Sequence, residues 1–132
     1  MGRNSPARVR SARTPIRPAT RTVADHLDAA AQRDVMALER SSLGPGAVAL
    51  ALRSWKKHVH GPARQVSVVA DGCPCCHAGY SRDVLETALR ALPRGSARQL
   101  RALVQPLDET FLARTWPDPT APLDRPWWER RS

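Results

Sequence analysis

The 132-residue sequence has no apolar segment long enough to cross a membrane. Its longest apolar run covers residues 47–52, whereas a transmembrane helix needs roughly 20 apolar residues. No apolar segment follows the basic N-terminal residues either, so we expect no secretory signal peptide. The sequence therefore predicts a cytoplasmic protein without a membrane partner.

Signatures of common enzymes are also missing. The sequence contains no P-loop, no Gly-x-Gly-x-x-Gly turn, no Gly-x-Ser-x-Gly elbow and no His-Glu-x-x-His motif. A zinc deaminase would need a cysteine where Ala78 stands. The acidic pairs Asp25/Asp28 and Asp108/Glu109 fit the first turns of helices better than a catalytic cleft. An enzyme is therefore the weakest interpretation, and it is confined to thiol chemistry.

Lysine is nearly absent, and the positive charge is unevenly distributed. The net charge is +9, and only Lys56 and Lys57 among the 21 basic residues are lysines. Residues 1–21 carry six arginines and no acidic residue, whereas residues 22–115 carry 12 basic and 9 acidic residues. We therefore predict a disordered basic arm, 1–21, rather than a basic face on the folded body. The arm residues expected to contact nucleic-acid phosphates are Arg3, Arg8, Arg10, Arg13, Arg17 and Arg21.

Aromatic residues make up only 5% of the chain, and three of the four tryptophans lie in residues 116–132. The prolines of this segment disfavour a helix and predict an extended tail. Tryptophan is costly to leave in water, so Trp116, Trp127 and Trp128 should either pack across the helical body or anchor a protein partner.

Helical spacing of apolar residues dominates the middle of the chain, residues 22–115. It predicts helices over about 22–40, 47–60, 81–92 and 96–104, and Pro106 should start or kink a last, turn-rich helix. Residues 47–55 also alternate like a strand, but their alanines favour a helix. We therefore expect a mainly α fold of about four short helices.

Helix caps and one strand complete this prediction. Thr22 with Asp25, Ser81, and Ser96 with Gln99 are the expected N-terminal caps. Residues 65–70 are rich in valine and end at an Asp-Gly pair, which is typical of a strand. The strand leads directly into the cysteine cluster, so we predict one strand followed by a turn like a zinc knuckle.

Cysteine is rare, but its three occurrences form one run, Cys73-Pro74-Cys75-Cys76, followed by His77. The two-residue gap between Cys73 and Cys76 allows both sulfurs to bind one ion, and this stretch resembles the Cys-Pro-x-Cys knuckle of small zinc modules. The further ligands would come from Cys75, His77, His58 or His60. We therefore expect a structural zinc ion, and a site shared between two chains stays open.

Two other interpretations of the cysteines are kept. Cys-x-x-Cys before a helix is also typical of thiol redox proteins, although this chain is poor in strands. The thiols could also be buried in a turn as small apolar groups. The favoured prediction is a non-catalytic zinc-binding protein that associates with nucleic acid through its arm; the alternative is an adaptor that docks through its tail.

Overall fold

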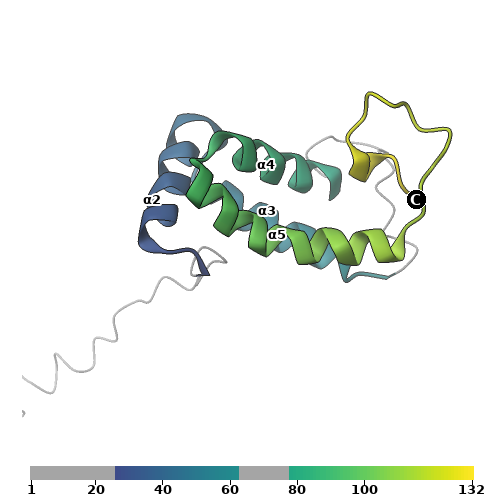
Figure 1. The fold of residues 1–132 in the computed structure, drawn as a ribbon, viewed down its shortest axis with the longest axis horizontal. Helices are drawn as coiled ribbons and strands as arrows, with labels where there is room; N and C mark the ends of the chain where they lie inside the picture. Colours follow the sequence, from purple (N-terminus) through teal and green to yellow (C-terminus); the bar gives the residue numbers. More distant parts are fainter. Residues whose placement is uncertain (1–25, 63–77) are drawn as a thin grey trace, which may run out of the picture.

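Four α-helices make up most of residues 26–62 and 78–132, which are the residues that the computed structural model describes (Figure 1). The helices are α2 (Ala29–Leu38), α3 (Ala47–Val59), α4 (Ala78–Ala91) and α5 (Arg94–Arg114). A short π-helix, η2 (Glu39–Leu43), follows α2, and a 3-10 helix, η4 (Trp127–Glu129), lies in the tail. The prediction of a mainly α fold is confirmed.

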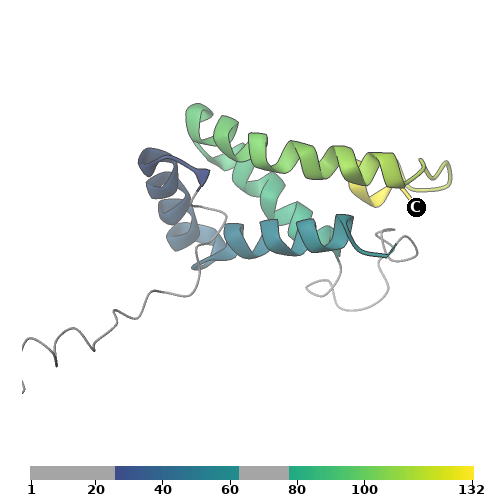
Figure 2. The same ribbon diagram turned by 90° about the horizontal axis from the view of Figure 1, so that it is seen from below.

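Helices α3, α4 and α5 run side by side in alternating directions, and α2 lies across one end of them (Figures 1 and 2). The interior between them contains fully buried Trp55, Leu85, Leu100 and Phe111. On α3, the buried residues recur at the spacing expected for one helical face, which confirms that residues 47–55 are helical rather than extended. Within the described ranges, no helix is both long and apolar enough to span a membrane.

Acidic side chains bind main-chain nitrogens at the N-terminal ends of α2 and α3. Asp28 caps α2, and its carboxylate accepts a hydrogen bond from the main-chain nitrogen of Ala31 at 2.8 Å. The largely buried Glu39 accepts hydrogen bonds from the main-chain nitrogens of Gly46 and Val48, at 2.7 and 3.3 Å, where α3 begins. A carboxylate suits this position because a helix N-terminus carries unpaired N–H groups and a partial positive charge.

Besides α2, which is capped by Asp28 and begins at Ala29 rather than near Thr22, two predicted helix starts are wrong. Ser81 lies inside α4, which begins at Ala78, and Ser96 lies inside α5, which begins at Arg94. Contacts from α2 explain the second difference. The Ser96 hydroxyl donates to the Asp34 carboxylate, and the Gln99 side chain exchanges two hydrogen bonds with Asp28. These side chains therefore join two helices instead of capping one.

Pro106 does not start a last helix, which was one of the two predicted alternatives, because α5 continues through it from Arg94 to Arg114. Proline lacks an N–H group and costs about 3 kcal/mol inside a helix. Val104 and Phe111, which are buried on either side of it, anchor both halves of α5 to the same core. Tertiary packing thus outweighs the local signal of the proline.

The C-terminal tail folds back onto itself and onto the helices. Trp116 and Ser132 exchange two main-chain hydrogen bonds at 2.8 and 2.9 Å, and Pro117 forms an isolated β-bridge with Arg131. The loop between these ends places Trp128 in the hydrophobic core, with 4% of its surface exposed, and packs Trp127 against that core. The tail is therefore part of the folded body.

Several predicted elements lie outside the described residues. They are the basic arm, the Thr22/Asp25 cap, the strand at 65–70 and the knuckle-like turn.

Replacing the buried Trp128 should destabilise the protein far more than replacing the exposed Trp116. We expect Trp128→Ala to lower the free energy of unfolding by about 3–5 kcal/mol, because a large core side chain is lost. Trp116→Ala, at a site that is 79% exposed, should change it by less than about 0.5 kcal/mol. Urea denaturation followed by circular dichroism measures both values. Equal losses would contradict a tail that completes the core.

Candidate functional site

A buried cation, Arg82 of α4, joins two helices and the tail. Only 4% of its surface is exposed. Its Nε and Nη2 atoms donate to the two carboxylate oxygens of Asp108 on α5, each at 2.9 Å, and Nη1 donates to Glu86 at 3.0 Å. The guanidinium carbon lies 4.5 Å from the ring centre of Trp128 and 5.6 Å from that of Trp127. Hydrogen bonds and cation–π contacts therefore meet at one side chain.

The same cluster continues to α3 through Trp55. The indole nitrogen of Trp55 donates to Asp108 at 3.0 Å, so this carboxylate accepts bonds from α3 and α4 together. The Trp55 ring stacks on His58, with ring centres 5.6 Å apart, and packs against Phe111 at 5.0 Å. Asp108 therefore lies in the middle of α5 as a tertiary contact, and the prediction that it marks a helix start is wrong.

The two carboxylates around Arg82 are shifted in opposite directions. Burial raises the pKa of Asp108, and the hydrogen bonds from Arg82 and Trp55 only partly oppose this effect. Burial also acts to raise the pKa of Glu86, but hydrogen bonds from Arg82 and Arg90 outweigh it and lower this pKa. The difference follows from position, because Glu86 lies nearer the surface and has a second cationic partner.

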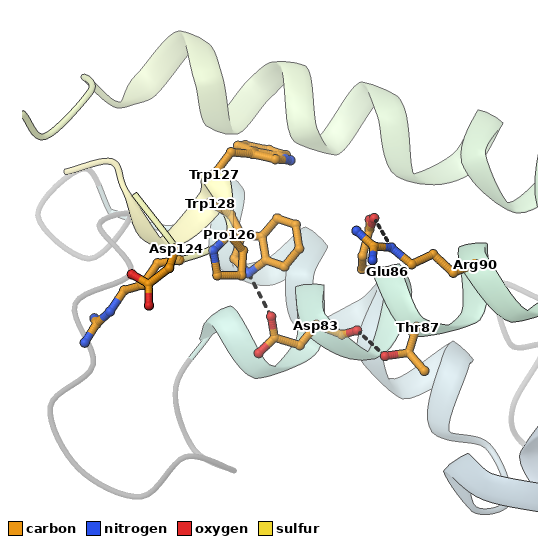
Figure 3. Close-up of a pocket in the computed structure, with 9 residues that line it drawn as sticks. Asp83, Glu86, Thr87, Arg90, Asp124, Pro126, Trp127 and Trp128 are labelled. Atoms are coloured by element: carbon orange, nitrogen blue, oxygen red, sulfur yellow. Dashed lines mark hydrogen bonds and ion pairs between the residues drawn. The ribbon is translucent and has the colours of Figure 1, made fainter. Parts of the chain in front are cut away.

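Next to this cluster, a pocket of about 420 Å³ separates α4 from the tail (Figure 3). The Trp128 indole donates to Asp83 at 3.0 Å, and the Thr87 hydroxyl donates to the Asp83 carbonyl at 3.0 Å. Glu86 accepts a hydrogen bond from Arg90 at 3.1 Å. The Trp128–Asp83 bond joins the tail to α4, and the other two bonds lie within α4. Because these polar groups bind one another, we interpret the pocket as structural.

The surface of α3 carries a second charged feature. Arg53, Lys56 and Lys57 are all exposed, and the helix contains no acidic residue. Their spacing of three and four residues places them on one side of the helix, away from the buried face. None of the ion pairs found within residues 26–62 and 78–132 involves them. We call these three residues the α3 basic face.

A further cation lies at the C-terminal end of α3. Arg114 of α5 donates to the carbonyl oxygen of Val59, and to that of Gly61 at 2.7 Å. It thereby caps the negative end of the α3 dipole and adds positive charge at the C-terminal end of this helix. The described part of the body therefore carries exposed cations on α3, in addition to the charge predicted for the arm.

The first turns of α5 carry another set of exposed cations, Arg94, Arg98 and Arg101. Asp28 and Asp34 bind Gln99 and Ser96 of this same segment. With 3.6 residues per turn, the three arginines lie on the opposite side of α5 from Ser96, so they face away from these carboxylates.

The residues predicted to bind metal are only partly described. His58 is half-buried against Trp55, and His60 is exposed where α3 ends. Within the two described ranges, no group of three or more His, Cys, Asp or Glu side chains could hold a metal ion. Cys73, Cys75, Cys76 and His77 lie outside those ranges. The zinc site therefore stays a prediction.

The residues predicted to bind a protein partner fall into two groups. Trp127 and Trp128 contact Arg82 and each other inside the fold, whereas Trp116 is 79% exposed. A partner that used Trp127 or Trp128 would have to displace them from these contacts. The six arginines predicted to bind nucleic acid lie outside the described residues.

Sequence reasoning missed both charged features for different reasons. The spacing of Arg53, Lys56 and Lys57 could have indicated that they share one side of a helix. By their position alone, the lysines predict only favourable charges at a helix end. The i,i+4 spacing of Arg82 and Glu86 predicts only a pair within one helix. The burial of Arg82 could not be predicted, because Asp108 is 26 residues away and the tail tryptophans are farther still.

Removing Arg82 should destabilise the fold, whereas removing Arg90 should not. Both arginines bind Glu86, but Arg90 is 80% exposed. We expect Arg82→Met to lower the free energy of unfolding by about 3 kcal/mol or more, because it leaves Asp108 buried without its cation. Arg90→Met should cost less than about 0.5 kcal/mol. Urea denaturation distinguishes them, and two equally small losses would contradict the role of Arg82.

Comparisons with protein-family models, with curated proteins and with solved structures found no match for this chain.

Proposed function

We propose that the protein is a small, non-catalytic, zinc-binding protein that associates with nucleic acid. The α3 basic face carries this proposal. It combines three exposed cations, no acidic neighbour on the helix and the nearby guanidinium of Arg114. Phosphate groups are the natural partners of such a surface, because neutralising them releases condensed counterions and provides most of non-specific binding.

The dimensions of this face suit a short stretch of one strand. A helix rises 1.5 Å per residue, so Arg53 and Lys57 lie about 6 Å apart along the α3 axis. One strand of duplex DNA carries a phosphate about every 3.4 Å along its axis. The face would therefore contact about two phosphates. The six arginines of the arm, 1–21, would contact further phosphates and account for most of the affinity.

Zinc would reinforce the end of the bundle where this face lies. His58 and His60 lie at the C-terminal end of α3, and α4 begins at Ala78, directly after His77 in the sequence. Figures 1 and 2 show the end of α3 and the start of α4 at the same end of the bundle. This arrangement supports a zinc ion bound by Cys73 and Cys76 together with a histidine of α3.

Neutralising the α3 basic face should weaken nucleic-acid binding. We expect a variant with Arg53→Gln, Lys56→Gln and Lys57→Gln to bind a labelled oligonucleotide less tightly and with a shallower salt dependence. Each lost phosphate contact should reduce the log–log slope by about 0.9 on duplex DNA and about 0.7 on a single strand. Fluorescence anisotropy at several salt concentrations measures affinity and slope.

The matched control removes the same charge from α5 through Arg94→Gln, Arg98→Gln and Arg101→Gln. This control should lose less affinity, because these exposed arginines lie on α5 and a contact made by the α3 basic face does not involve them. Equal losses would show that only net charge matters and would contradict a specific role of α3. Deleting residues 1–21 should weaken binding further, and unchanged affinity would exclude the arm from the interface.

Purified protein should contain about one zinc ion per chain, which mass spectrometry of the native protein measures. Cys73→Ser should abolish zinc binding and lower the thermal stability, since metal binding contributes folding free energy in a small domain. His26→Ala provides the control, because His26 is exposed ahead of α2 and should not affect zinc content. A metal-free protein with ordinary thiol reactivity would contradict the zinc site.

A further inference from the structure

An apolar groove of about 410 Å³ lies between the turn after η2, helix α3 and helix α4. Its apolar lining includes Leu43, Pro45, Leu50, Ala51, Tyr80 and Val84. Two of these side chains are strongly exposed, Leu50 at 57% and Tyr80 at 48%. The groove therefore presents an accessible aromatic ring beside an aliphatic wall, and its volume is typical of pockets that hold small ligands.

The groove borders the α3 basic face. Leu50 and Ser54 line the groove, and Arg53 and Lys57 each follow one of them by three residues on the same helix. Residues three apart on a helix are direct neighbours, about 5–6 Å between their Cβ atoms. A ligand that enters the groove would therefore have two cations next to it.

We infer that this groove receives a base of single-stranded nucleic acid while Arg53 and Lys57 bind the adjoining phosphates. This inference rests on the proposed function and names the form of nucleic acid that the α3 surface recognises. Proteins that bind single strands combine a cationic surface with aromatic side chains on which bases stack. Tyr80 provides the aromatic ring, and the α3 basic face provides the cations.

The polar atoms of the groove favour a base over an apolar peptide side chain. Three serines, Ser42, Ser54 and Ser81, also line it. The Ser42 hydroxyl already donates to the Leu38 carbonyl at 3.3 Å. A base edge offers hydrogen-bond partners to Ser54 and Ser81, whereas an apolar side chain offers them none, and burying a hydroxyl without a partner costs free energy. Paired bases in a duplex are stacked inside the helix, so a duplex could contact the α3 basic face but not fill the groove.

The test compares two labelled strands of equal length, one with normal bases and one fully abasic, against the full-length protein. The abasic strand keeps every phosphate, so any difference in affinity comes from the bases. We expect the wild-type protein to bind the normal strand at least about five-fold more tightly, in line with the stacking of one base on an aromatic ring. Fluorescence anisotropy at fixed salt gives both dissociation constants.

Tyr80→Leu should abolish this preference while leaving the affinity for the abasic strand unchanged, because the ring is lost but the cations stay. Trp116→Leu is the matched control, since it removes another exposed aromatic ring that does not line the groove. It should keep the full preference for the normal strand. Thermal unfolding of each variant verifies that the fold is intact.

The outcomes separate this inference from the proposed function. Equal binding of both strands by the wild-type protein, or an equal loss for both strands in Tyr80→Leu, overturns the inference and leaves phosphate binding by the α3 basic face in place. A groove that instead binds an acidic amphipathic peptide, with no preference for bases, also overturns it. Failure of the wild-type protein to bind either strand overturns the proposed function itself.

Discussion

The fold depends on the buried guanidinium of Arg82. Removing a cation from water is costly, and the cost is offset only when its donors are paired and its faces are covered. Asp108 and Glu86 accept its hydrogen bonds, and Trp127 and Trp128 cover it. Its partners come from α4 itself, from α5 and from the tail. The position of each element is therefore constrained by the others.

This dependence explains why a tail rich in proline and tryptophan belongs to the body. A small domain buries a limited fraction of its surface, so each large side chain in its core matters. Trp128 adds one such side chain, and its indole nitrogen is paired with Asp83. With the tail engaged internally, the charged and apolar surfaces of α3 and α4 become the better candidates for binding a partner. The basic face and the groove lie side by side there, as a mixed anionic and aromatic ligand requires.

Local patterns predicted the helices well where one apolar face dominates. The buried face of α3 follows directly from the spacing of Val48, Leu52, Trp55 and Val59. The predicted caps at Ser81 and Ser96 are wrong. Ser81 lies inside α4, and the Ser96 hydroxyl donates to Asp34 of α2. Of the candidate site, the cations of α3 could have been recognised from their spacing. The groove could not, because Leu43 and Tyr80 approach each other only after α3 and α4 pack.

The sequence by itself determined the helical class and the concentration of positive charge in the first 21 residues. These properties depend on residues that are close together in the sequence. The spacing of apolar residues and the local count of charges therefore predict them directly. Only the tertiary structure decided that α5 runs through Pro106, that Arg82 is buried between the tail and two helices, and that a groove adjoins the α3 basic face. Each of these depends on side chains that are far apart in the sequence, and their free energy of contact arises only when the helices pack together.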